Sequence, residues 1–159
     1  MSFDDWLLAL HMVAAFAFVG AVAFFAVLIV AGWRTERPRA AVAVMRLTIV
    51  PTVMVAAGSI LVLVFGIWLA ISLDAYQPWD GWVIAAVVLW VIAIEAGRRG
   101  GDAYNRASTL AKELVAKGDD APSPELRALL RDRTALMLNV VSSLAVLLIL
   151  IDMIWKPGA

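Results

Sequence analysis

The distribution of positive charge along the chain constrains its fold more than any other feature. Twelve of the 13 Lys and Arg residues fall in two stretches, Arg34–Arg46 and Arg98–Arg133, and long apolar runs lie on both sides of each stretch. The connection Asp74–Asp80 and the N-terminal segment Met1–Asp5 hold no Lys or Arg. Because Lys and Arg beside membrane spans stay on the cytoplasmic side, this asymmetry predicts four spans with both ends of the chain outside.

The composition indicates a single integral membrane domain over residues 1–159. The hydrophobic content is 64%, and a formal net charge of +0 hides the segregation of the charges into the connections. The basic residues alternate with Asp and Glu beside the apolar runs, which argues against nucleic acid as a partner. The sequence contains no cysteine, so disulfides and Cys-based metal clusters are excluded.

The predicted fold is an all-α membrane protein, a bundle of four transmembrane helices in up-down order. The expected spans cover about residues 6–32, 46–73, 81–97 and 134–155. Six of the seven tryptophans fall near predicted span ends, where the amphipathic indole favours the headgroup level. Pro51 lies about one turn inside the second span and favours a kink there.

The segment 98–133 is expected to form a cytoplasmic helical hairpin between the third and fourth spans. Its first half has an apolar face at helical spacing, made by Ala103, Ala107, Leu110 and Leu114. This half is predicted either as an interfacial helix or as an extension of the third span. A break is expected at Gly118–Pro122, followed by Ser123 as an N-cap and Pro124 at the first helical position. We expect this second helix to run unbroken into the fourth span.

Two ionisable residues fall inside the predicted membrane region on the outer side. His11 is the only histidine and lies in the first span, and Asp152 lies near the outer end of the fourth, followed by Met153. Imidazole, carboxylate and thioether groups can bind copper, and His with Met can ligate haem iron. His11, Asp152 and Met153 are therefore the candidate metal ligands, with His11 as the candidate haem ligand. The alternative is a packed, hydrogen-bonded His11 and an Asp152 at headgroup level.

Other polar residues suggest structural roles. Arg46 and Glu95 are expected at similar depth near the inner ends of neighbouring spans, which predicts an ion pair between them. Asn139, Ser142 and Ser143 are expected to hydrogen-bond across helices. No nucleophile–base pair, phosphate-binding glycine loop or metalloprotease motif is present, so no catalytic residue is assigned and the sequence favours a protein that is not an enzyme.

Short motifs at both ends resemble a known family. They are Leu10-His11 with Gly20, Arg46 followed by Pro51, and the ending Met153-Ile154-Trp155-Lys156-Pro157. They resemble a family of uncharacterised bacterial four-helix integral membrane proteins, which is similar in layout to the copper-resistance D and HemJ-like proteins. The resemblance implies the four-helix fold and a first-span histidine that serves haem, a role that only His11 can inherit. The partner lysine within the spans is missing here, which argues against protoporphyrinogen oxidation.

Three classes of function remain open. The first is a non-catalytic accessory or scaffold subunit in a bacterial inner membrane, which packs its apolar surface on a larger complex or on a second copy. The second is a haem- or copper-binding protein that uses His11. The third is a small transporter or channel, for which the spans carry too few polar residues to line a pathway. The sequence favours the first class, with the second as the alternative.

Overall fold

The protein is built from helices and short connections. The computed structural model describes residues 2–73, 77 and 79–156, and no strand occurs among them. The helices are α1 (Phe3–Trp33), α2 (Pro38–Leu47), α3 (Ile49–Ser72), α4 (Gly81–Ala116), α5 (Pro124–Leu130) and α6 (Arg133–Trp155). Four stretches are long and apolar enough to cross a membrane: Phe3–Trp33, Pro38–Ser72, Gly81–Ala116 and Pro124–Trp155. The predicted all-α class with four spans is thereby confirmed.

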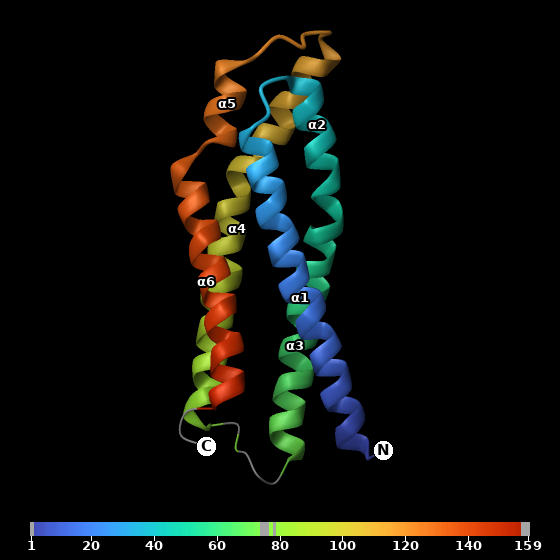
Figure 1. The fold of residues 1–159 in the computed structure, drawn as a ribbon, viewed down its shortest axis with the longest axis vertical. Helices are drawn as coiled ribbons and strands as arrows, with labels where there is room; N and C mark the ends of the chain where they lie inside the picture. Colours follow the sequence, from blue (N-terminus) through green and yellow to red (C-terminus); the bar gives the residue numbers. More distant parts are fainter. Residues whose placement is uncertain (1, 74–76, 78, 157–159) are drawn as a thin grey trace.

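The long helices run side by side in alternating directions (Figure 1). The start of α1 and the end of α6 lie at one end of the bundle, and the α1–α2 and α4–α5 connections lie at the other (Figure 1). We call these the terminal end and the charged end. The spans pack mainly as two pairs, α1 against α3 and α4 against α6.

Two apolar clusters join the pairs to each other. In the middle of the bundle, Phe18 of α1 packs with Ala93 of α4 and with Ala145 and Val146 of α6. Towards the terminal end, Ala70 of α3 packs with Trp82 and Val83 of α4, and Met153 of α6 lies against this cluster. The bundle is thus held together by small residues and a few large ones, as expected where lipid replaces water around the helices.

The second span is interrupted close to the position where the sequence predicts a kink. Helix α2 ends at Leu47 and α3 begins at Ile49, with Thr48 between them still in helical geometry. Pro51 has no N–H to donate to the carbonyl of Leu47, so one rung of the helical hydrogen bonds is missing at this point. The Thr48 hydroxyl donates to the Met45 carbonyl at 2.7 Å. The helical start at Pro38, well before the expected span, was not predicted.

Helix α4 extends far beyond the span expected at 81–97. It continues without interruption to Ala116, so the amphipathic segment is an extension of the third span rather than a separate interfacial helix. The helix ends before Gly118, whose φ of 79° lies in the left-handed region that glycine adopts readily. Ser123 then caps α5 by accepting from the Leu126 N–H, with Pro124 at its start, as predicted.

The expectation of an unbroken helix from Ser123 into the fourth span is wrong. Helix α5 ends at Leu130, and a new helix, α6, begins at Arg133. The Asp132 carboxylate accepts from the Ala135 N–H at 2.7 Å and so caps α6. The break lets α5 turn its own apolar side into a separate core.

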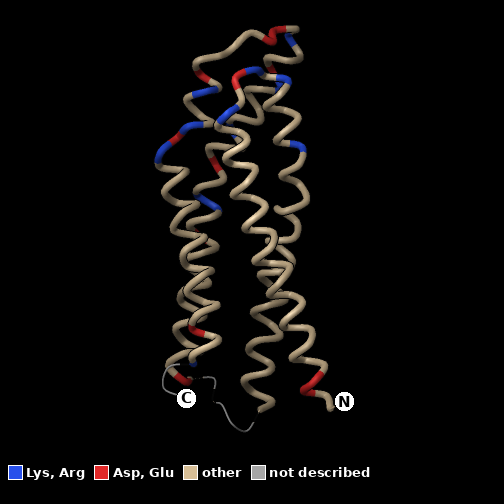
Figure 2. The backbone as a smooth tube through the Cα atoms, viewed as in Figure 1, with Lys and Arg blue, Asp and Glu red and all other residues tan. Residues whose placement is uncertain are grey.

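That core lies at the charged end. Ala41 of α2, Ala107 and Ala111 of α4, and Leu126 and Leu130 of α5 form one buried cluster. We call the part of the chain around it, residues 34–47 and 98–132, the charged cap. Most of the coloured Lys, Arg, Asp and Glu positions gather in this part of the molecule (Figure 2). The cap is therefore a small packed unit with an alanine-rich interior and a charged exterior.

Candidate functional site

His11 is packed between α1 and α3. It lies on the same face of α1 as the buried residues Leu7, Ala14 and Phe18, and its own side chain is partly buried. Its Nδ1 lies 3.1 Å from the carbonyl oxygen of Val62 on α3. A carbonyl oxygen only accepts hydrogen bonds, so Nδ1 must carry the proton and donate it. In the neutral ring the lone pair is then on Nε2.

Gly66 of α3 makes this arrangement fit. A Cβ at this position would lie 2.9 Å from Cε1 and 3.2 Å from Nδ1 of His11, closer than side chains normally approach. The imidazole therefore lies directly on the backbone of α3, where no side chain separates it from the Val62 carbonyl. Sequence reasoning assigned His11 but missed Gly66, because only the packing of two helices places the two residues together.

Asp152 and Met153 lie on α6, in the other helix pair. Towards the terminal end, α1 and α6 lie on opposite sides of the bundle (Figure 1). Met153 packs against Ala70, Trp82 and Val83, whereas His11 contacts Val62 and Gly66. Within the described part of the chain, no group of three or more His, Cys, Asp or Glu side chains is placed to hold a metal ion.

Glu95 is paired within its own helix. Its carboxylate accepts from Nε of Arg99 at 2.6 Å and from both Nε and Nη2 of Arg98 at 2.9 Å. Arg46 is exposed at the end of α2, and no ion pair joins it to Glu95 among the described residues. The structure thus differs from the expected pair. Residues three and four positions apart are already neighbours on a helix face. An ion pair within α4 therefore costs less conformational entropy than an ion pair between two helices.

The polar residues of α6 lie along its contact with α4. Ser142 donates across the interface to the Ala93 carbonyl at 2.7 Å, as predicted. Asn139 and Ser143 instead bond within α6, to the carbonyls of Ala135 and Asn139. The facing residue of α4 is Gly100, where a Cβ would lie 2.7 Å from Asn139 Nδ2. Asn139 and Ser142 are thus part of a close contact between α6 and α4.

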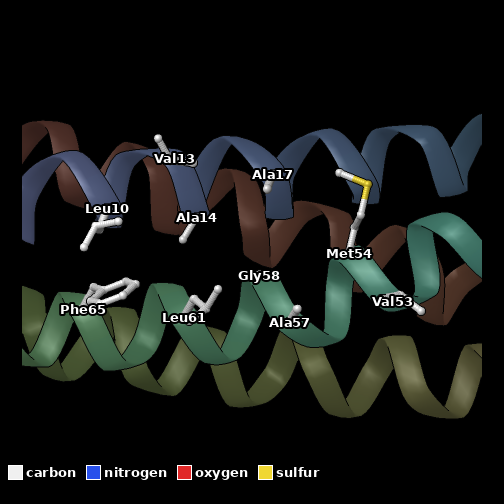
Figure 3. A pocket seen from close by; sticks show the side chains of 10 residues that line it. All are labelled: Leu10, Val13, Ala14, Ala17, Val53, Met54, Ala57, Gly58, Leu61 and Phe65. Carbon is white, nitrogen blue, oxygen red and sulfur yellow. The ribbon is translucent and has the colours of Figure 1, made fainter.

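An apolar groove of about 280 Å³ runs between α1 and α3. Figure 3 shows its small residues, Ala14 and Ala17 on α1 and Ala57 and Gly58 on α3, between larger side chains. The larger lining residues are Leu10, Val13, Val53, Met54, Leu61 and Phe65. Several of them are strongly exposed, up to 66% for Val13. The sequences of α1 and α3 show no amphipathic face, so the sequence alone does not indicate this groove.

The fold and these sites define an integral membrane protein with four helical spans, an apolar surface and one charged cap. The chain belongs to the family described as "Predicted integral membrane protein (DUF2269)", which matches residues 5–157. No curated protein and no solved structure matches it. The predicted membership in an uncharacterised four-helix membrane family is confirmed. The likeness in layout to the copper-resistance D and HemJ-like proteins stays a prediction.

Proposed function

We propose that the protein is a non-catalytic accessory or scaffold subunit of a membrane complex, and that it binds a transmembrane helix of its partner in the α1–α3 groove. The observation that carries this proposal is the groove itself, with small residues at its base and exposed apolar side chains along its edges. Helices in a membrane associate where small residues allow close backbone approach, because burial of apolar surface gains little when the surroundings are lipid.

The base of the groove is closely packed against buried residues. Gly58 lies so close to α1 that an added Cβ would be 3.2 Å from the N, Cα and Cβ atoms of Phe18. Phe18 is itself buried in the central cluster that joins the two helix pairs. A partner helix would therefore meet a preformed surface, which lowers the entropy that binding costs.

The orientation of the protein is part of this proposal. The charged cap faces the cytoplasm of a bacterial cell, and the terminal end faces the outside of the inner membrane. Support comes from the twelve Lys and Arg residues between Arg34 and Arg133, against one, Lys156, near the terminal end. The partner then has its own span beside α1 and α3, and the cap is available to its cytoplasmic part.

The proposal is tested by photo-crosslinking in native membranes. A photoreactive phenylalanine analogue at Ala57, inside the groove, should give one crosslinked protein adduct of defined mass. The matched control is the same analogue at Leu147 of α6, which is 51% exposed and lies outside the groove. Adducts to lipid alone at Ala57, or the same protein adducts at both sites, would show that the groove holds no partner helix.

A second candidate function, haem or copper binding, is favoured by the hydrogen bond of His11. A metal-ligating histidine commonly donates its second ring N–H to a backbone carbonyl, which fixes the tautomer and orients the ring. The Nδ1–Val62 bond has this form and leaves Nε2 as the donor atom for the metal. The remaining ligands would come from a partner chain, since His11 and Asp152 lie in different helix pairs.

Metal analysis and optical spectra of the purified membrane protein test this candidate. If His11 serves a redox group, the wild type carries haem or copper in stoichiometric amount and His11→Ala loses it. Gly20→Ala, in the same helix with no atom of another helix within 4 Å of the added methyl group, is the control that should keep it. Equal metal and haem content in wild type and His11→Ala would leave the scaffold function alone standing.

A further inference from the structure

A second pocket lies on the outside of the α4–α6 pair near the terminal end. Its volume is about 250 Å³, and it is lined by Leu89 of α4 and by Leu148, Ile151, Asp152 and Trp155 of α6. Leu148, Ile151 and Trp155 are 48%, 40% and 72% exposed, so the pocket opens towards the surrounding lipid. It is distinct from the α1–α3 groove and from His11.

Asp152 supplies the charged group among the residues that line this pocket. It is only 9% exposed, and its Oδ2 atom is buried with no hydrogen-bond partner among the described residues. Asp152 does accept a hydrogen bond, from the Lys156 N–H, but through its backbone carbonyl. A carboxylate removed from water without a partner is strongly disfavoured, and ionisable groups at such depth mark ligand or ion sites.

The cationic side chain that follows α6 is directed elsewhere. Lys156 comes one helical turn after Asp152, and its Nζ lies over the ring of Trp82, 5.6 Å from the ring centroid. Trp82 belongs to the cluster on the interior side of α4, with Ala70 and Met153. The Lys156 ammonium thus contacts the ring of Trp82, a residue that does not line this pocket.

We propose that this pocket binds a lipophilic organic monocation, with the positive charge at the Asp152 carboxylate and the apolar part against Leu89, Leu148 and Trp155. The carboxylate supplies the complementary charge, and the indole of Trp155 offers a face that attracts cations. A hard divalent metal ion is a poor fit, because it requires several oxygen ligands and no cluster of three acidic or His/Cys side chains occurs in the described chain.

The route of the ligand follows from the exposure of the lining. Since the apolar wall faces lipid, a cation with an apolar body enters from the bilayer, in the orientation proposed above from its outer leaflet, rather than through a water-filled channel. Its charge then lies within reach of the headgroup region, where Trp155 is also expected. An ammonium, phosphonium or guanidinium group with an apolar substituent satisfies both requirements.

Equilibrium dialysis with tetraphenylphosphonium tests the proposal on the full chain in lipid nanodiscs. The wild type should bind the probe saturably, one per chain, above the partition into empty nanodiscs. Asp152→Asn should weaken this binding at least tenfold. Asp5→Asn, the same change at an exposed carboxylate of the terminal end, should leave it unchanged. A neutral tetraphenyl compound of the same shape should bind at least tenfold more weakly than the cation.

A second variant covers a failure of Asp152→Asn to fold. Leu89→Trp keeps the carboxylate and fills the pocket, so it should also abolish saturable binding of the probe. Non-saturable uptake by the wild type, equal binding by Asp152→Asn, or equal binding of the neutral compound would each overturn the proposal. Because the pocket is separate from the groove, none of these results bears on the crosslinking at Ala57.

Discussion

At the scale of the residue, glycines decide which side chains can approach a neighbouring helix. Gly66 lets the His11 ring lie directly on the backbone of α3. Gly58 lets the backbone of α3 approach the backbone of α1 at Phe18. Gly20 and Gly101, by contrast, have no atom of another helix within 4 Å of the place that a methyl group would take. A methyl group is therefore expected to disturb the packing at Gly58 and Gly66 and to be accepted at Gly20 and Gly101.

We expect Gly66→Ala to destabilise the protein by about 1–3 kcal/mol, because the added methyl group overlaps the His11 ring and displaces it from Val62. The measurement is the free energy of unfolding in mixed micelles, titrated with denaturing detergent. Gly20→Ala is the control and should change stability by no more than about 0.5 kcal/mol.

The same prediction has a coupling test. In a His11→Ala background the ring is gone, so Gly66→Ala should lose most of its cost, and the two changes should be non-additive. An equal cost in both backgrounds would show that the methyl group acts on something other than the His11 ring.

At the scale of the element, two local features determine how the fourth span is placed. Helices α4 and α6 approach each other closely at Gly100, where the Ala135 carbonyl and Asn139 lie against the α4 backbone. The start of α6 is set by the Asp132 cap, which separates it from α5. One feature fixes the distance between two helices, and the other fixes where a helix begins.

Gly100→Ala should weaken the α4–α6 pair by about 1–3 kcal/mol. The added Cβ would lie 3.2 Å from the Ala135 carbonyl oxygen, which belongs to the backbone and cannot rotate away. The adjacent Gly101→Ala should be neutral or stabilising by up to about 1 kcal/mol, since alanine favours helix over glycine. Thermal unfolding of the two variants in detergent compares them directly, and equal effects would rule out the close contact.

Asp132→Ala should cost about 0.5–2 kcal/mol, because the Ala135 N–H loses its acceptor at the start of α6. Asp132→Ser keeps a capping oxygen and should retain most of the stability. Amide hydrogen exchange should report faster exchange at the first turn of α6 in Asp132→Ala only. Unchanged exchange there would mean that the helix start does not depend on this side chain.

At the scale of the whole molecule, the charged cap and the membrane bundle are two packed regions built from the same helices. The cap has its own buried cluster, formed by residues of α2, α4 and α5. The bundle is held by the central cluster around Phe18 and by the cluster around Ala70 and Trp82. Helix α4 passes through both regions, so it connects the cap rigidly to the spans.

The proposed orientation predicts a definite pattern of labelling in cells. The chain has no natural cysteine, so single cysteines can be introduced without removing any. Ala121→Cys in the cap should react with a membrane-impermeant thiol reagent only after the inner membrane is opened. Ser2→Cys, at the terminal end, should react in intact cells whose outer membrane is permeabilised. The reverse pattern would invert the topology.

Local sequence was sufficient for features that depend on one segment at a time. The four spans follow from the cost of placing charges in lipid. The end of α4 before Gly118 follows from the backbone freedom of glycine, and the start of α5 after Ser123 follows from the capping by its hydroxyl group. Asp132 is also a capping residue, but the apolar periodicity on both sides of it concealed the break between α5 and α6.

Only the tertiary structure decided which faces of the spans meet. Each span is apolar nearly all round, so hydropathy does not set its rotation about its own axis, and depth alone placed His11 near Asp152 and Arg46 near Glu95. Close packing at Gly58, Gly66 and Gly100 fixes the rotation instead. It pairs α1 with α3 and α4 with α6, puts His11 and Asp152 in different pairs, and leaves the groove and the Asp152 pocket open to lipid.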